Sequence, residues 1–322
     1  MKLSSLATRL LLAMAAFPLV AMAQSAYPSR AISLTVGFSP GGPTDTVGRA
    51  IAQKLASVLG QTVIVENKPG ADGRIQLQHL AHAPADGYQI GLTDSGLAVN
   101  ALLYKTPPYD VNKDFTLITY VGDMPNAIAV PSDLKIDTLK DFLAYARARP
   151  GKLNYAATAS STILATEMLL DMANLSIERV RYKGAAVAFP ALMTGEIQLM
   201  VSAAGTLAPF VKQQGKIKAL AVTSKRRTPV MPDVPTTAEA GLPDYVATNW
   251  YAIVGPANMP AAVVEKLNAA LQKVLADRDV VAQLERIGIT PDPAPASRLE
   301  SVLKSDLQKF DAVINKANLK TD

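Results

Sequence analysis

The sequence contains no cysteine among its 322 residues. Disulfide bonds, a thiolate nucleophile and a lipid-modified cysteine at the N-terminus are therefore excluded. Histidine is nearly absent too, with His79 and His82 as the two residues of this type. They lie three residues apart on an expected helix, without a metalloprotease motif or clustered carboxylates, so we expect a solvent-exposed helix face. This composition argues against an enzyme and leaves a serine hydrolase as a distant alternative.

Charged and aromatic residues are also few, at 18% and 6%. The formal net charge is +5, and removing Lys2 and Arg9 leaves +3. The densest basic cluster, Lys225-Arg226-Arg227, lies between Ser224 and Pro229 and is expected in a solvated loop. This dispersed charge excludes the usual footprint of a nucleic-acid-binding protein but suits the attraction of small anions.

Long hydrophobic runs are confined to the N-terminus. Leu10–Val20 is an uncharged apolar stretch that follows Lys2 and Arg9 and precedes Ala21-Met22-Ala23. The pattern predicts a signal peptide over residues 1–23, cleaved before Gln24. The stretch is short for a transmembrane helix, so an uncleaved anchor is the less favoured alternative. We therefore expect an exported protein of the periplasm.

The rest of the sequence alternates expected strands with expected helices. Thr44–Leu59 places Val47, Ile51 and Leu55 on one helix face, and Thr138 to Asp141 has the spacing of a capping box. We expect strands at 32–38, 62–66, 88–93, 115–121, 127–130, 154–158, 179–182, 197–202, 217–222 and 246–254, and two final helices at 261–275 and 299–314. Such alternation predicts an α/β fold of mostly parallel sheets with helices on both faces.

The organisation predicts two α/β lobes. We expect lobe 1 to comprise residues 24–124 and 249–322, and lobe 2 to comprise residues 125–248. The linking strands would lie near residues 121–127 and 247–254. Ligands of such folds bind at the carboxyl ends of strands, so a cleft between the lobes is the expected site. We expect neither a cofactor nor a metal.

The first candidate site is a glycine-containing turn between an expected strand and helix, with the residues Pro40, Gly41, Gly42, Pro43, Thr44 and Asp45. Its glycines let backbone N–H groups approach a ligand, and the helix N-terminus favours an anion. No lysine follows the glycines, and the spacing is not G-x-G-x-x-G, so a nucleotide site is not expected. The spacing alone supports an anion site and a structural turn about equally.

Four other strand ends carry small or polar residues. Each is an ordinary loop or helix cap by itself, but together with the first turn they form a ring of hydrogen-bond donors suited to a carboxylate. The candidate residues are Asp94 and Ser95, Thr158, Ala159, Ser160, Ser161 and Thr162, Tyr182 and Lys183, and Ser202 and Ala203. Trp250-Tyr251, in contrast, is expected in the core.

Ten stretches of the chain form a recognisable set that covers essentially the whole mature chain, in order. They are Tyr27–Arg30, the Pro-Gly-Gly-x-Thr-Asp turn, Val65–Ala71, Ala85–Tyr88, Tyr109-Asp110 with Lys113–Phe115, Pro150–Tyr155, Tyr182–Gly184, Leu220–Ser224, Pro232–Thr236 and Ala238–Gly241. With this set the chain resembles the TctC or Bug family, the periplasmic receptors of tripartite tricarboxylate transporters.

The resemblance implies a type II-like, two-lobed "Venus flytrap" that closes on a small organic carboxylate and delivers it to membrane permease subunits. It implies that one ligand carboxylate contacts the first turn, at Phe38, Ser39, Gly42, Thr44 and Asp45. The loop after Asn154-Tyr155 would supply contacts from lobe 2. We expect a monomer, and an orphan sensor that signals to a membrane kinase is the alternative function.

Two departures from the family pattern concern the ligand. The family often has Gly-Ser-Ala-Gly-x-Gly-Ser where this chain has Ala156–Thr162, so glycines are replaced and hydroxyl donors are added. Many members carry Phe-Asp where Val201-Ser202 stands. Because an acidic side chain there could receive an amino group, Ser202 argues against an amino-acid ligand.

Overall fold

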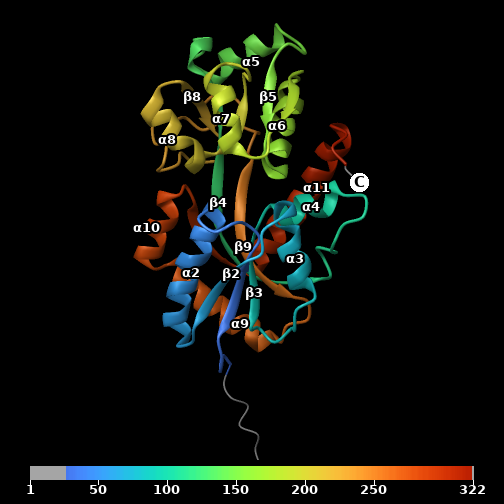
Figure 1. Cartoon of the computed structure of the whole chain (residues 1–322), viewed down its shortest axis with the longest axis vertical. Helices are drawn as coiled ribbons and strands as arrows, with labels where there is room; N and C mark the ends of the chain where they lie inside the picture. Colours follow the sequence, from blue (N-terminus) through green and yellow to red (C-terminus); the bar gives the residue numbers. More distant parts are fainter. Residues whose placement is uncertain (1–26, 321–322) are drawn as a thin grey trace, which may run out of the picture.

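The computed structural model describes residues 27–320, and Figure 1 shows two lobes, one above the other. The predicted signal peptide lies outside the described residues. Two long strands, β4 (Phe115–Pro131) and β9 (Thr248–Pro256), run between the lobes. The two-lobed α/β fold class is confirmed. Because β4 is continuous across residues 124 and 125, the exact lobe boundaries stay a prediction.

The sheet of lobe 1 combines parallel and antiparallel pairs. Its strands are β1 (Ile32–Val36), β2 (Val63–Asn67), β3 (Gln89–Asp94), β4, β9 and β10 (Thr290–Pro295), in the order β10-β4-β9-β3-β1-β2. The predicted parallel pairing is confirmed for β1 with β2 and β3. The pairs that involve β4 and β9 are antiparallel, because these two strands run in opposite directions between the lobes.

The continuity of β4 corrects the predicted division into two strands at 115–121 and 127–130. Gly122 and Pro125 read as breaks in the sequence, but both lie inside the strand. Gly122 has φ 155°, and an added Cβ would lie 2.3 Å from the carbonyl oxygen of Thr290, so glycine permits the close approach of β10. Pro125 pairs with Thr248 at the end of the β9 ladder, just before β4 begins to pair with β7.

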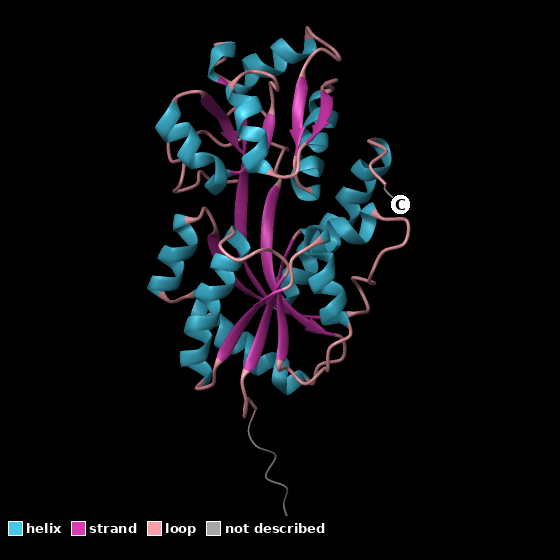
Figure 2. Cartoon of the chain, in the orientation of Figure 1, coloured by secondary structure: helices cyan, strands magenta, loops and turns pink. Residues whose placement is uncertain are grey.

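Lobe 2 surrounds the second half of β4. Strands β7 (Met200–Ala203) and β8 (Ile217–Val222) pair antiparallel with β4, while β5 (Asn154–Ala157) and β6 (Glu178–Arg181) form a separate parallel pair. Figure 2 shows helices on both sides of these strands. The helices are α5 (Leu139–Arg147), α6 (Ser160–Ala173), α7 (Ala185–Met193) and α8 (Ala204–Gln214). Thr138 caps α5 as predicted, since its hydroxyl accepts the Asp141 N–H at 3.1 Å.

Lobe 1 carries the helices from both ends of the chain. They are α2 (Pro43–Leu59), α3 (Arg74–Ala81), α4 (Gly96–Leu103), α9 (Ala261–Leu275), α10 (Arg278–Arg286) and α11 (Ala296–Lys316). The prediction of two helices at the C-terminal end of the chain, at 261–275 and 299–314, was therefore incomplete, because it missed α10 and β10 between them. Strand β10 reads Thr-Pro-Asp-Pro-Ala-Pro, a sequence typical of a loop, and it pairs with β4 through an irregular register.

Each lobe has its own hydrophobic core. The largest fully buried side chains include Trp250 and Tyr120 in lobe 1 and Tyr155, Tyr245 and Phe142 in lobe 2. Burial of a large apolar side chain contributes about 1.5–3 kcal/mol, so each core stabilises the lobe that contains it. Trp250 and Tyr251 are 1% and 2% exposed, which confirms their predicted core position.

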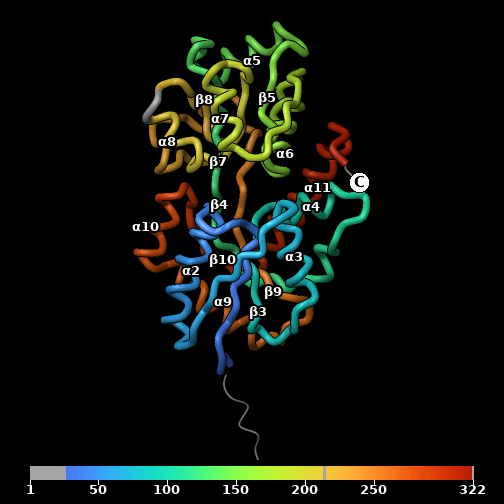
Figure 3. The backbone as a smooth tube through the Cα atoms, in the orientation of Figure 1, coloured from blue at the N-terminus to red at the C-terminus, as the bar shows by residue number. Residues whose placement is uncertain are grey.

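The lobes also touch away from β4 and β9. The end of α11 reaches lobe 2, where Ile314 packs with Leu164 of α6. Figure 3 shows α11 in red and α6 in yellow-green. Lys316 of α11 forms an ion pair with Asp171 of α6. At another edge, Gly205 at the start of α8 meets the backbone of Ile287. The lobes are thus closely apposed at two edges.

Candidate functional site

The turn after β1 leads directly into α2 and lies on the side of lobe 1 that faces lobe 2 (Figure 1). Gly41 has φ 84° and an added Cβ would meet nothing within 4 Å, so backbone conformation and not crowding favours glycine here. Ser39, Pro40, Gly41 and Pro43 are exposed, whereas Thr44 and Asp45 are 5% and 2% exposed. The turn therefore presents its backbone, and not the Asp45 side chain, to solvent.

The Asp45 carboxylate is held by donors of lobe 1. Its Oδ2 accepts the Gly41 N–H and the Arg49 Nε–H, both at 2.9 Å, and its Oδ1 accepts from Asn67 Nδ2 at 2.8 Å. The hydrogen bond from Arg49 lowers the pKa of Asp45 to about 2, against the opposing effect of burial. Asp45 thus stabilises the turn as an anion.

A second loop abuts this turn. After β2 the chain forms a short 3-10 helix, Ala71–Gly73. A Cβ added to Gly37 would lie 2.8 Å from the Cα of Gly73, so the two loops touch backbone to backbone. Between them, Asn67 donates to the carbonyl oxygen of Phe38 at 3.0 Å. Asp72 in this loop therefore lies next to the first candidate turn.

The end of β3 brings Asp94 and Ser95 to Asn249 of β9. The Ser95 N–H donates to Asn249 Oδ1 at 3.2 Å, the Ser95 hydroxyl donates to the same oxygen, and Asp94 Oδ1 accepts the Gly96 N–H at 2.8 Å. Burial, and secondarily the negative charge of Asp72, raise the pKa of Asp94 to about 6. The charge of Asp72 thus affects Asp94 at the end of β3.

In lobe 2 the loop before α6 is internally hydrogen-bonded. Thr162 Oγ1 accepts the Ala159 N–H at 3.2 Å and lies 3.1 Å from Thr158 Oγ1. The first N–H groups of a helix lack intrahelical partners. One of them, that of Ser160, donates to Asp72 Oδ2 of lobe 1 at 3.2 Å. This hydrogen bond links the candidate loops of the two lobes.

The remaining candidates of lobe 2 are less tightly grouped. The Tyr182 hydroxyl lies 3.4 Å from Glu196 Oε1, and the side chain of Lys183 is exposed. Ser202 is 3% exposed because β7 pairs with β4 at this position. Ala203 packs against the core of lobe 1. Ala203 therefore helps to join the lobes, whereas Ser202 is buried within lobe 2.

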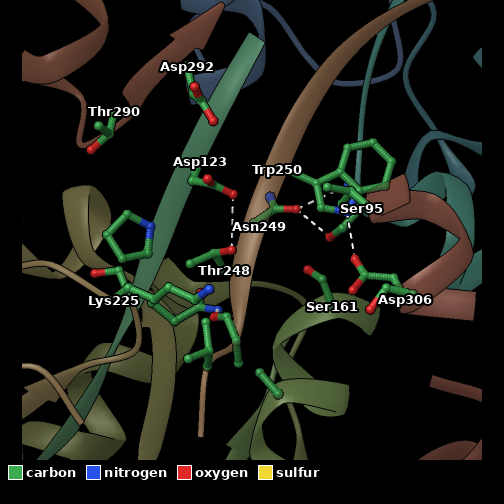
Figure 4. A pocket seen from close by; sticks show the side chains of 18 of the residues that line it. Ser95, Asp123, Ser161, Lys225, Thr248, Asn249, Trp250, Thr290, Asp292 and Asp306 are labelled. Atoms are coloured by element: carbon green, nitrogen blue, oxygen red, sulfur yellow. Dashed lines mark hydrogen bonds between the residues drawn. The ribbon is translucent and has the colours of Figure 1, made fainter. Parts of the chain in front are cut away.

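A cavity of about 730 Å³ lies between the lobes along β4 and β9 (Figure 4). Ser95 and Ser161 are the two predicted site residues among those that line it. Asp123 Oδ1 accepts from the Tyr120 hydroxyl at 2.6 Å and from Thr248 Oγ1 at 3.1 Å. An interlobe cleft was predicted from the sequence, but the lining by Asp123 and Thr248 was not.

This cavity lies beside α11 and extends to the starts of α4 and α6, because Asp306, Ser95 and Ser161 all line it. Successive side chains of a strand point to opposite faces. Tyr251 packs into the core cluster that contains Val47 of α2, whereas Trp250 donates to Asp306 of α11 at 2.7 Å. Asp123 pairs with Trp250 and shares its face. Asp123 and Trp250 therefore lie on the α11 face of the strands, while Asn249, the neighbour of Trp250 along β9, also lines the cavity.

Sequence reasoning thus found the helix N-termini but missed Asp72 and Asn249. The structure connects the first turn, through the Asp72 loop, to the start of α6. Tyr182 does not take part in this chain of contacts, because its hydroxyl donates to Glu196 and its N–H to the Ala157 carbonyl oxygen. Asp72 had a usable signal, because Asp-Gly at positions 72–73 is a common turn sequence. Asn249 had no comparable sequence signal, because it lies within the apolar strand β9.

Several other functions find no support in residues 27–320. His79 and His82 are exposed at the end of α3, as predicted. This part of the chain has no group of three or more acidic or histidine side chains placed to hold a metal ion. Within the same residues, none of the helices combines the length and apolar character needed to cross a bilayer.

Two α/β lobes, joined by long strands and with helix N-termini facing the space between them, define the class of periplasmic solute-binding proteins. A family model described as "Tripartite tricarboxylate transporter family receptor", TctC, matches residues 47–319. The chain belongs to this family. It is 32% identical to Protein BugT of Bordetella pertussis over 298 residues, which cover 91% of each chain.

Solved structures give the same result. The Rpa4515 protein of R. palustris with adipate has a TM-score of 0.79 and 31% identity, covering 91% of this chain and 98% of its own. MatC of Rhodopseudomonas palustris with bound malate has a TM-score of 0.76 and 29% identity, covering 89% of this chain and 100% of its own. The family and the fold class predicted from the sequence are confirmed.

Proposed function

We propose that this receptor captures a small organic carboxylate between the turn after β1 and the loop before α6, and delivers it to the permease subunits of a tripartite transporter. The ligand is held without chemical change. The observation that carries the proposal is the linked arrangement of the two helix N-termini, one from each lobe, around one interlobe region. Helix N-termini favour anions through their free N–H groups and dipole.

The liganded neighbours support this proposal. Rpa4515 holds adipate and MatC holds malate, and both are dicarboxylates. In this chain, exposed Ser39 and partly exposed Ser160 and Ser161 supply hydroxyl donors near the two helix starts. A charge-assisted hydrogen bond contributes about 1.5–3 kcal/mol, so a few suffice for micromolar affinity after ordering costs.

Closure is proposed to occur about β4 and β9. Lobe 1 would comprise residues 24–124 and 249–322 and lobe 2 residues 125–248, with a cleaved signal peptide over residues 1–23 that directs the chain to the periplasm. The edge contacts of Lys316 with Asp171 and of Gly205 with Ile287 would then form on closing and break on opening. The receptor would act as a monomer.

A thermal-shift screen of mono- and dicarboxylates, each beside its neutral amide, tests the ligand class. Ligands that bind only the folded state raise the melting temperature. We expect at least one carboxylate to raise it and the matching amide to leave it unchanged. Stabilisation by amides alone would overturn the carboxylate assignment, and stabilisation by neither would overturn the proposed capture of small organic acids.

The exposed and partly exposed side-chain donors are tested by Ser39→Ala combined with Ser160→Ala. Both changes keep approximate volume, so we expect the fold to survive while affinity for the best carboxylate falls about tenfold, as loss of one charge-assisted bond implies. Unchanged affinity would remove these two side chains from the site. Ser57→Ala, on the exposed face of α2, is the matched control and should leave affinity unchanged.

A further inference from the structure

Asp72 is the side chain of lobe 1 that reaches the start of α6. Its backbone has φ 55° and ψ 42°, a left-handed conformation that few residues other than Gly, Asn and Asp adopt. The buried Asn100 holds this conformation, because its Nδ2 donates to the Asp72 carbonyl oxygen at 3.0 Å. The loop is thereby fixed with the carboxylate directed toward lobe 2.

The carboxylate of Asp72 is an anion that the protein itself supplies to α6. Asp72 Oδ2 accepts the Ser160 N–H at 3.2 Å, at the first residue of a 14-residue helix. An anion at this point is stabilised by the helix dipole and by otherwise unpaired N–H groups. A ligand carboxylate arriving there would compete with Asp72 for the same donors.

The negative charge of Asp72 also affects Asp94. This charge is the second cause, after burial, of the raised pKa of Asp94. A Cβ added to Gly96 would lie 2.7 Å from Asp94 Oδ1 and 3.8 Å from the Asp72 carbonyl oxygen, so the three residues are close neighbours. Asp94 therefore lies beside Asp72, and Asp72 supplies the carboxylate that reaches α6.

We propose, on the basis of the function proposed above, that Asp72 makes this receptor selective for monocarboxylates over dicarboxylates. The ligand carboxylate binds at the turn after β1, where the Asp45 charge is balanced by Arg49 and Asn67. The other end of the ligand meets Asp72 and Asp94, where a second carboxylate is repelled and a neutral or hydrogen-bond-donating group is accepted.

Isothermal titration with matched ligand pairs tests this selectivity. The pairs are butanoate and succinate, hexanoate and adipate, and benzoate and terephthalate, measured on wild type and on Asp72→Asn. We expect wild type to bind the monocarboxylate of its best pair about tenfold more tightly. Asp72→Asn keeps an oxygen acceptor for the Ser160 N–H but removes the charge, so we expect the preference to fall to about equal affinity.

Two further variants complete the experiment. Asp133→Asn removes an exposed aspartate from the middle of another short 3-10 helix, Ser132–Leu134, and should retain the wild-type preference. Asp72→Gly is compatible with the left-handed backbone at this position. It replaces Asp72→Asn in the titrations if that variant does not fold, and circular dichroism checks the fold of both variants. Asp72→Gly should lose the preference as well.

The outcomes separate this inference from the proposed function. If carboxylates bind and the preference is the same in wild type and both Asp72 variants, the role of Asp72 is wrong and the proposed function stands. A wild-type preference for dicarboxylates would likewise show that the role of Asp72 is wrong and would leave the proposed function standing. If no carboxylate of any pair binds, the proposed function and the inference both fail.

Discussion

The helix N-termini of the two lobes both meet an aspartate, but the aspartates differ in origin. At α2 the partner is Asp45 of the same helix, which is held by Gly41, Arg49 and Asn67 within lobe 1. At α6 the partner is Asp72, which comes from the other lobe. The α2 turn is therefore stabilised whether the lobes are open or closed, whereas the Asp72 contact exists only when they are close. Asp45 therefore stabilises the fold of lobe 1, whereas Asp72 forms a contact between the lobes.

Asp45→Asn gives the largest expected effect. The change leaves Arg49 and the Gly41 N–H without an ionised acceptor at a side chain that is 3% exposed, so the free energy of unfolding should fall by about 3 kcal/mol. Urea denaturation measures it. As a control, Asp137→Asn breaks an exposed ion pair with Lys218 and should change stability by less than about 0.5 kcal/mol. Equal effects would show that Asp45 is not the structural aspartate.

The pH dependence of stability tests Asp94, which lies beside Asp72. Its pKa is raised to about 6 in the folded protein from an ordinary value of 3.8, so the folded state binds the proton more tightly than the unfolded state. Stability should therefore rise as the pH falls from 6 to 4, by up to about 3 kcal/mol. Denaturation midpoints across this range measure the effect, and Asp94→Asn should remove it. A wild-type profile already flat between pH 4 and 6 would contradict it.

The smallest expected effect concerns closure at the opposite edge. An added Cβ at Gly205 would lie 2.0 Å from the carbonyl oxygen of Ile287, so Gly205→Ala forces the backbones of the two lobes apart. We expect carboxylate affinity to fall about tenfold, equivalent to about 1.4 kcal/mol, with little change in far-ultraviolet circular dichroism. Small-angle scattering with saturating ligand should show a larger radius of gyration. Affinity equal to that of wild type would mean that this edge contact is not required for binding.

The sequence predicted the local elements well because their determinants are local. The helix at 261–275 was predicted with the bounds that the structure has, and the strand-to-helix turn at 38–45 was located from Pro-Gly-Gly followed by an amphipathic pattern. Hydrophobic periodicity and turn residues are sufficient for such elements.

The missed features depend on contacts between distant residues. The continuity of β4 depends on pairing with β9 on one side of Pro125 and with β7 on the other, and β10 is a strand only because β4 accepts it. Asp72 meets Ser160 across 88 positions of sequence. No local pattern encodes these pairings. The ring of donors stays a prediction, and the contact of Asp72 with the start of α6 was not predicted.

A crystal structure with the carboxylate that most strongly raises the melting temperature tests the central claim most directly. The account predicts the ligand carboxylate within hydrogen-bond distance of the turn at residues 39–45, with Asp72 facing its other end. A ligand lodged instead in the cavity beside Asp123 and Trp250, on the α11 side, with the turn unoccupied, would contradict it.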